Sequence, residues 1–281
     1  MKVFLTGATG FIGSTVLKTL CEENIDTIAN RRNIYSQPKI SFVHKMSWLT
    51  KPMDEIGIDD LKNVDVLIHL ASHSVQYPFD SLDNCITFNV THPLKLFKTA
   101  FAAGVKKFII AGTCFEYGES GQNYDFIPVN AALLPTNTYA TSKAMAYLAF
   151  RQFSLDYPVA INYHRIFHVF GEGESLERLW PKIRIAAKEG VDLELSPGEQ
   201  IRDFINVVDV ATQILASAKK LHLSQERGMI VQNLGSGNPQ SVKEFVTYWW
   251  KRFEATGKLK FGAISYRKNE IMRFVPKLNK D

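Results

Sequence analysis

Three closely spaced glycines follow a strand-like segment at the start of the chain and precede a helical pattern. The segment 2–6 reads KVFLT, the glycines lie in TGATGFIG, and a helix is expected at 11–22. Glycine permits a tight turn and close approach of the backbone to a bound pyrophosphate, which the unpaired amides of a helix N-terminus also attract. This order predicts the first β-turn-α unit of a dinucleotide-binding domain. The residues expected to bind the cofactor here are Gly7, Gly10, Phe11, Ile12 and Gly13.

Short apolar runs continue to alternate with helical patterns over residues 1–170. Apolar runs separated by helices are typical of parallel strands buried on both faces, with right-handed crossovers that place helices on both sides of the sheet. The predicted fold class is therefore α/β, a Rossmann-type doubly wound parallel sheet. The expected strands are 2–6, 26–30, 40–44, 64–70, 106–110 and 159–167, and the expected helices are 11–22, 83–103 and 139–155.

The pattern loosens after about residue 170, where turns, single strands and helices follow one another in mixed order. We expect these segments to form a small mixed α/β lobe beside the main sheet. A cleft between two such parts is a common ligand site. The predicted division is a dinucleotide-binding Rossmann domain at 1–170, to which 201–220 returns, and a substrate-binding lobe at 171–200 and 221–281.

Composition and charge exclude several classes of protein. No apolar run approaches the roughly 20 residues of a membrane helix, the start lacks the features of a signal peptide, and the three cysteines are widely spaced. We therefore expect a cytoplasmic protein with no membrane partner. The net charge is +5, and residues 258–281 hold seven basic and two acidic residues. This basic tail indicates either a phosphate-bearing ligand or a solvated surface, and nucleic acid is disfavoured because no binding motif accompanies it.

The end of the second expected strand bears on the choice of cofactor. Asn30 stands where an acidic residue would accept the ribose hydroxyls of NAD, and Arg31 and Arg32 follow it. An arginine in this place pairs with a 2′-phosphate. The sequence therefore favours NADP(H) over NAD(H), which stays possible, and the alternative is a pair of surface arginines at a strand end.

A second set of residues has the pattern of proton-transfer chemistry. Tyr139 and Lys143 lie four residues apart at the start of the helix expected at 139–155, so their side chains share one face. An ammonium group near a phenol is expected to lower the pKa of the phenol, which favours proton exchange with a substrate oxygen. Thr113 follows the strand 106–110, at the sheet edge where open parallel sheets bind ligands. We expect Thr113, Tyr139 and Lys143 to be catalytic, and we expect no metal site.

Seven motifs follow one another along the chain: TGATGFIG (6–13), IHLAS (68–72), NVTHPLKLFKTA (89–100), HRIFHVFGEGE (164–174), RDFINVVDVA (202–211), NLGSG (233–237) and YRKNEIM (266–272). Taken in this order, together with Thr113, Tyr139 and Lys143, they resemble the extended short-chain dehydrogenases/reductases of the nucleotide-sugar epimerase/dehydratase family. The resemblance implies that Lys143 also binds the nicotinamide ribose and that Ala71 lines the cofactor. It further implies a nucleotide-sugar substrate and a possible homodimer. The residues implied to contact the substrate are Asn89, His168, Arg202 and Arg267.

One departure from the family narrows the reaction. In 4,6-dehydratases of this family, the stretch that corresponds to the one beginning at Thr113 resembles T-D-E-x-Y-G. This chain has Cys114 and Phe115 in the places of the Asp and the Glu, and Glu116 comes one residue later. A one-residue shift in an extended segment turns a side chain to the other face, so dehydration is disfavoured. The remaining reactions are NADPH-dependent reduction of a nucleotide-linked 4-keto-deoxyhexose for surface polysaccharide, as in the similar CDP-abequose and CDP-paratose synthases, and epimerisation with retained NAD. A catalytically silent NADP(H) sensor is the alternative of another class.

Overall fold

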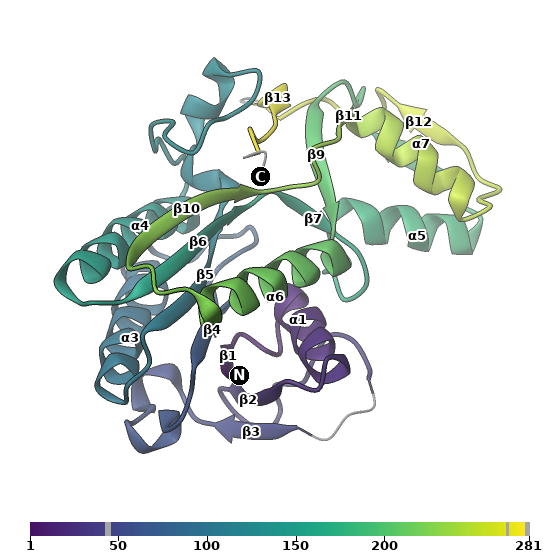
Figure 1. Ribbon diagram of the computed structural model, residues 1–281. Coiled ribbons are helices and arrows are strands. Elements are labelled where there is room, and N and C mark those ends of the chain that lie inside the picture. The colour runs from purple at the N-terminus through teal and green to yellow at the C-terminus, as the bar shows by residue number, and fades with distance from the viewer. Residues whose placement is uncertain (43–45, 268–269, 279–281) are drawn as a thin grey trace.

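A seven-stranded, entirely parallel sheet forms the centre of the protein (Figure 1). The computed structural model describes residues 1–42, 46–267 and 270–278. From one edge to the other the strands are β10 (Gly228–Leu234), β6 (Ala160–Ile166), β5 (Lys107–Thr113), β4 (Val66–His69), β1 (Lys2–Thr6), β2 (Asp26–Arg31) and β3 (Ser47–Thr50). The predicted doubly wound parallel fold is confirmed.

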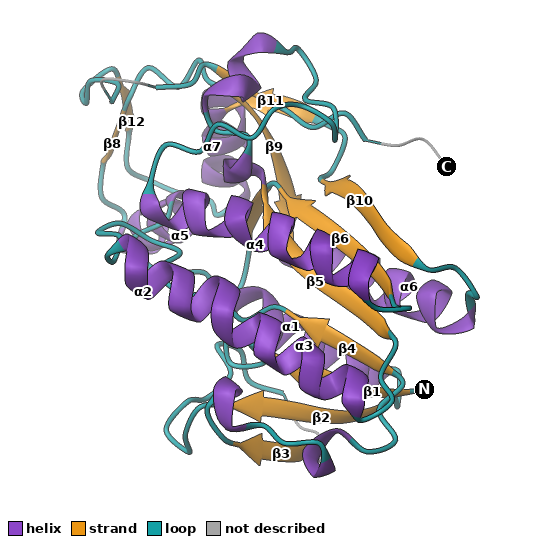
Figure 2. Cartoon of the chain, turned by 90° about the vertical axis from the view of Figure 1, so that its left-hand side faces the viewer, coloured by secondary structure: helices purple, strands orange, loops and turns teal. Residues whose placement is uncertain are grey.

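Helices cover both faces of this sheet, as Figures 1 and 2 show. Helices α1 (Phe11–Glu22) and α6 (Val207–Leu223) cover one face of the sheet and share an apolar core with its strands. Helices α3 (His92–Ala102) and α4 (Thr138–Asp156) cover the other face, where phenylalanines dominate the core. The strands are therefore buried on both sides, as their unbroken apolar runs predicted.

Two expected elements differ in the structure. Residues 40–42 of the strand expected at 40–44 form a loop, residues 43–45 lie outside the described part, and the edge strand is β3, which pairs with β2. The single helix expected at 83–103 is divided into α2 (Leu82–Ile86), a π-helical turn at Thr87–Thr91, and α3. The wider turn directs Asn89 inward, where its amide makes several hydrogen bonds.

A smaller lobe of mixed structure follows residue 170 and carries its own aromatic core, with Trp180, Phe245 and Trp250 buried. The predicted division needs two corrections. The strand β10 lies in the range 221–281 but extends the main sheet beside β6. Of the range 201–220, only the helix α6 returns to the main sheet, because residues 201–206 pair with strands of the lobe. The lobe strands are β7 (His168–Phe170), β8 (Leu193–Leu195), β9 (Ile201–Asn206), β11 (Pro239–Ser241), β12 (Leu259–Phe261) and β13 (Arg273–Phe274), and its helices are α5 (Leu179–Glu189) and α7 (Val242–Arg252). Short 3-10 helices lie at Met53–Glu55, Asp59–Leu61, Cys114–Glu116 and Glu119–Asn123.

Within the described ranges, we find no helix with the length and apolar character required to span a bilayer.

Candidate active site

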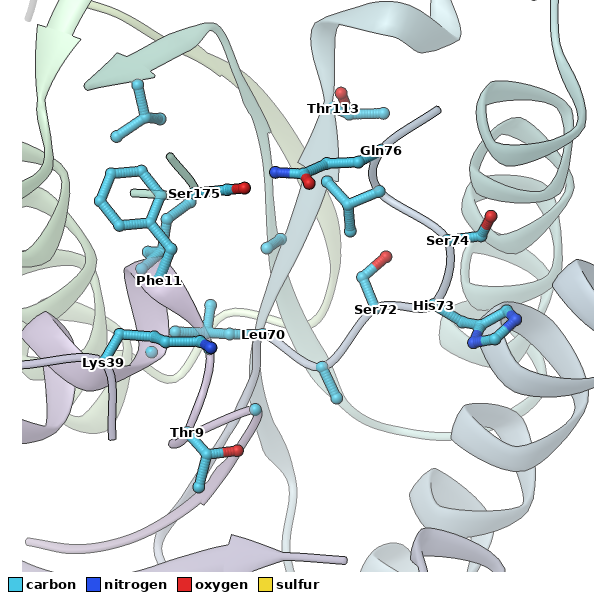
Figure 3. A pocket seen from close by; sticks show the side chains of 18 of the residues that line it. Thr9, Phe11, Lys39, Leu70, Ser72, His73, Ser74, Gln76, Thr113 and Ser175 are labelled. Carbon is cyan, nitrogen blue, oxygen red and sulfur yellow. The ribbon is translucent and has the colours of Figure 1, made fainter. Parts of the chain in front are cut away.

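A cavity of about 1510 Å³ opens at the carboxyl edge of the parallel sheet (Figure 3). Its position follows from the strand order, because the connections run in opposite directions on either side of β1 and leave a crevice between β1 and β4. The wall is built from the turn after β1, the loop after β4, the end of β5, the start of α4 and the loop 171–178. Elements from both parts of the protein therefore face one ligand space.

The turn after β1 has the geometry of a phosphate cradle. Gly7 has a φ of +72°, and a Cβ at this position would lie 2.5 Å from the amide nitrogen of Ala71. A Cβ at Gly13 would lie 1.9 Å from the Gly7 carbonyl oxygen. Gly10 precedes α1 without a side-chain cap, so the first amides of the helix stay open to an anion. All three glycines line the cavity together with Phe11, Ile12 and Ala71, so these residues fit a dinucleotide.

Asn30 is fixed by the neighbouring strand. It is buried, and its Nδ2 donates hydrogen bonds to the carbonyl oxygens of Leu49 at 3.2 Å and Lys51 at 3.0 Å. The amide carries no charge, so the sheet edge here lacks the carboxylate that would repel a 2′-phosphate.

Two arginines and a lysine supply positive charge on the same wall. The Arg31 guanidinium lies over the Trp48 ring, 4.8 Å from the ring centre, and Arg32 lies over Phe88 at 5.9 Å. Lys39 also lines the cavity, and Figure 3 shows its ammonium directed into it. Sequence reasoning missed Lys39, because a lysine in a loop of irregular structure has no local signal.

Thr113, Tyr139 and Lys143 all line the cavity. Thr113 is the last residue of β5, and the other two occupy the first turns of α4. Lys143 Nζ donates a hydrogen bond to the Ala111 carbonyl oxygen at 2.8 Å. Ser72 also lines this cavity, and the hydroxyls of Ser72 and Thr113 lie near enough to the phenol of Tyr139 to lower its pKa. The convergence expected from three separate motifs is therefore present, and Ser72, from the motif IHLAS, is a participant that sequence reasoning did not identify.

The protonation of this group differs from the expectation. Burial raises the pKa of Tyr139 to about 12, and hydrogen bonds to Ser72 and Thr113 offset only part of the rise. Burial also lowers the pKa of Lys143 to about 8. The pKa of Tyr139 is therefore raised and not lowered toward neutrality as predicted, because burial of the phenol is the largest effect on it. Near neutral pH the phenol keeps its proton and is suited to donate it.

Glu116 points into the core and not into the cavity. It is fully buried, and its Oε2 accepts a hydrogen bond from Arg165 Nε at 2.7 Å. Its Oε1 accepts hydrogen bonds from the Tyr163 hydroxyl at 2.7 Å and from the Thr113 amide at 2.9 Å. The carboxylate is thus turned away as expected, but for a different reason: Cys114–Glu116 form a 3-10 turn and not the extended segment that the prediction assumed. In this turn Glu116 anchors the end of β5. The neighbouring Cys114 thiol is also buried, which raises its pKa to about 12.

The substrate-binding assignments divide in two. His168 lines the cavity, whereas its wall does not include Asn89, Arg202 or Arg267. Arg202 Nη2 donates a hydrogen bond to Glu270 Oε1 at 2.8 Å, and Arg267 is exposed.

Asn89 acts inside the protein. Its Oδ1 accepts a hydrogen bond from the His73 amide at 2.7 Å, and its Nδ2 donates to the His73 carbonyl oxygen at 3.1 Å and to Ser142 Oγ at 2.9 Å. These bonds tie the loop after β4 to α4. Because they occupy both polar atoms of its side chain, Asn89 positions the cavity wall, and the structure does not place it against a ligand.

The ordered parallel sheet, the glycine cradle and the buried Tyr139 and Lys143 together define a dinucleotide-dependent oxidoreductase. A family model described as NAD dependent epimerase/dehydratase family matches residues 3–234. The chain belongs to this family, and it is an enzyme.

The family relatives include epimerases and a sugar synthase. The chain is 27% identical over 286 residues to UDP-arabinose 4-epimerase 1 of Arabidopsis thaliana, covering 87% of this chain but only 65% of that protein. It is 25% identical over 274 residues to CDP-abequose synthase of Salmonella muenchen, covering 96% of this chain and 87% of that protein. The structure of MoeE5 in complex with UDP-glucuronic acid and NAD has the same fold, with a TM-score of 0.83 at 23% identity, covering 99% and 90% of the two chains.

Proposed function

We propose that this enzyme uses NADPH to reduce the ketone of a nucleotide-linked 4-keto-deoxyhexose. The observation that carries the proposal is the meeting of Thr113, Tyr139 and Lys143 at the cavity, while Glu116 is withdrawn into the core. Elimination of water from a sugar needs an additional acid and base beside the phenol. Thr113 is followed by a buried thiol and a buried, ion-paired carboxylate, so this stretch is unsuited to dehydration.

The residues of the cavity fit NADPH. The amides after Gly10 would hold its pyrophosphate, Arg31 and Arg32 its 2′-phosphate, and Lys143 its nicotinamide ribose. When bound, NADPH supplies a hydride to the ketone carbon. The uncharged Asn30 and the adjacent arginines support NADP(H) over NAD(H).

Tyr139 supplies the proton in this proposal. Its pKa of about 12 keeps it protonated at neutral pH, so it is ready to donate to an oxygen that gains negative charge. Thr113 and Ser72, whose hydroxyls lower the pKa of this phenol, would orient it toward the substrate oxygen. The pKa of Lys143 is about 8, so its amine is mostly protonated at neutral pH. In this form its positive charge stabilises the phenolate that remains after the proton transfer.

The relatives support a nucleotide-sugar substrate without deciding the reaction. Resemblance to a CDP-abequose synthase favours reduction of a deoxyhexose for surface polysaccharide, and resemblance to UDP-arabinose 4-epimerases favours epimerisation with retained NAD. The arginines at the end of β2 would bind the 2′-phosphate of NADPH. They therefore favour the reductase, because biosynthetic reduction commonly uses NADPH. We expect the enzyme to act in the cytoplasm, and a homodimer is proposed by family resemblance.

The test is NADPH oxidation measured spectrophotometrically with a panel of nucleotide-linked 4-keto sugars. The wild-type enzyme should oxidise NADPH only when such a sugar is present. Tyr139→Phe should reduce kcat by at least about 100-fold, because general acid catalysis contributes about that much. Tyr248→Phe, on a side chain that is 61% exposed, is the matched control and should leave kcat unchanged.

The outcomes separate the three functions. Interconversion of UDP-sugars without net loss of NADPH would favour the epimerase. Unchanged turnover in Tyr139→Phe would remove the proposed mechanism. Retained biological function in a protein without any turnover would support a sensor of NADP(H).

A further inference from the structure

Two polar atoms on one wall of the cavity have no partner. Among the described residues, Nδ1 of His168 and Oε2 of Glu174 are shielded from water and make no hydrogen bond. A buried polar atom without a partner costs about 1–3 kcal/mol. Both residues line the cavity through their other atoms, so a rotation of either side chain would bring its unpartnered atom to a ligand there and recover this free energy.

Glu174 has one carboxylate oxygen that accepts only a long hydrogen bond. Its side chain is only 6% exposed, and its Oε1 accepts a hydrogen bond from Arg178 Nε at 3.4 Å, the long end of the range. Burial raises the pKa of Glu174 to about 7, and the Arg178 charge limits the rise. At and above neutral pH the carboxylate is therefore available as an acceptor.

His168 adds a neutral ring to the same wall. Burial lowers its pKa to about 3, and the guanidinium groups of Arg202 and Arg178 lower it further. The charge of Arg178 therefore lowers the pKa of both His168 and Glu174. The uncharged imidazole offers an acceptor or a donor at Nδ1, according to its tautomer. The three side chains combine a carboxylate, a neutral ring nitrogen and a guanidinium.

We propose that Glu174, with Arg178 and His168, binds a pair of neighbouring hydroxyl groups on a sugar. Each hydroxyl both donates and accepts, so a diol can donate to the carboxylate and accept from the guanidinium at once. A phosphate fits this wall poorly, because the carboxylate repels it. Across the described ranges, no group of three or more His, Cys, Asp or Glu side chains is arranged to hold a metal ion.

The position of the loop 171–178 supports this assignment. Ser175 follows Glu174 and faces the cavity beside Phe11, as Figure 3 shows. A Cβ at Gly173 would lie 3.0 Å from Lys39 Cβ, so this loop reaches across to the dinucleotide-binding side. The inference rests on the proposed function for the kind of ligand, and the diol belongs either to the ribose of the nucleotide or to the hexose.

The test is isothermal titration calorimetry of the full-length protein, which requires no turnover. The ligands are CDP, 2′-deoxy-CDP, CDP-glucose, their uridine counterparts and NADPH. The variants are Glu174→Ala and Glu174→Gln, with Glu177→Gln as the control, because Glu177 is in the same loop but is 83% exposed. Circular dichroism melting confirms that each variant is folded.

The expected result is a loss of affinity in Glu174→Ala of about tenfold, equivalent to about 1.4 kcal/mol, with a smaller loss in Glu174→Gln and none in Glu177→Gln. A ribose diol predicts that the preference for CDP over 2′-deoxy-CDP disappears in Glu174→Ala. A hexose diol predicts that the advantage of CDP-glucose over CDP disappears. Equal affinities in wild type and both Glu174 variants, or a loss confined to NADPH, would overturn the subsite. A wild-type protein that binds no nucleotide or nucleotide-sugar would instead overturn the proposed function and, with it, the subsite.

Discussion

Replacement of Glu116 tests whether the buried ion pair behind the active site holds the end of β5. Glu116 and Arg165 are 0% and 1% exposed, and Glu116 accepts three hydrogen bonds of 2.7–2.9 Å. Removing one partner of a buried pair costs about 3–5 kcal/mol, because the other charge is left without compensation. Glu116→Ala should therefore lower the free energy of unfolding by about 4 kcal/mol, a large part of the 5–15 kcal/mol typical of a folded domain. Glu116→Gln keeps the shape and should cost about 2–3 kcal/mol, because an amide bonds less strongly than a carboxylate.

The assay is urea unfolding followed by circular dichroism, with the midpoint and slope fitted for each variant. The control is Glu23→Gln, because Glu23 pairs with Lys219 at 2.9 Å while the two side chains are 51% and 49% exposed. An exposed pair contributes about 0–1 kcal/mol, so this variant should unfold almost as the wild type does. If Glu116→Gln cost no more than Glu23→Gln, the carboxylate would not be the anchor that the geometry indicates.

A double substitution separates the charge effect from packing. Glu116→Leu combined with Arg165→Met removes both buried charges and leaves apolar side chains of similar size. The double variant should be more stable than Glu116→Leu alone, since no unpaired guanidinium remains. It should still lose activity, because the Thr113 amide would no longer be held at 2.9 Å by a carboxylate oxygen. A double variant less stable than the single one would contradict the electrostatic reasoning.

Three further predictions concern the cavity. Gly13→Ala should abolish NADPH binding, because the added Cβ would lie 1.9 Å from the Gly7 carbonyl oxygen. Gly10→Ala should weaken binding less, because its Cβ would lie 3.2 Å from the same oxygen. NADPH fluorescence titration measures the affinity of both variants. Substitution of Arg31 and Arg32 by Ala should reduce the ratio of kcat/KM for NADPH over NADH by about tenfold or more, because two charged partners of a 2′-phosphate are lost. The folded-state pKa of Glu174 is raised from 4.5 to about 7, so its contribution to stability is full below pH 4.5 and is lost as the pH rises to about 7. Glu174→Gln should therefore flatten the decrease in melting temperature over this interval.

Local patterns predicted the elements that depend on short stretches of sequence. β1 and α1 match their expected ranges 2–6 and 11–22, because an apolar run, a glycine turn and a helical period are all encoded nearby. The edge strand β3 was missed, since SWLT is short and its position depends on pairing with β2. The addition of β10 beside β6 likewise depends on pairing between residues far apart in the chain.

The site shows the same limit at the level of single side chains. The spacing of Tyr139 and Lys143 predicted that both reach one face, and both line the cavity. The spacing did not predict their protonation, because the degree of burial and the Ala111 carbonyl that engages Lys143 depend on the packing of α4 against the sheet. A pattern thus identifies which groups meet, and the surrounding dielectric decides which of them carries the proton.

The placement of Glu116 links the chemistry to the stability of the fold. A carboxylate one position earlier would take the place of Phe115 in the 3-10 turn Cys114–Glu116, where the side chain lines the cavity, and could have served as an acid or base. In this chain the Glu116 carboxylate neutralises Arg165 and accepts a hydrogen bond from the Thr113 amide. It cannot leave the core without leaving the buried Arg165 guanidinium unpaired, which is costly. Moving the acid back to position 115 by Phe115→Glu would therefore add a group near the cavity without releasing Glu116. We expect this variant to fold, because Phe115 is 39% exposed, and to gain no dehydratase activity, because position 114 still carries a buried thiol. Detection of water elimination from a nucleotide-sugar by mass spectrometry in this variant would show that a single carboxylate is enough.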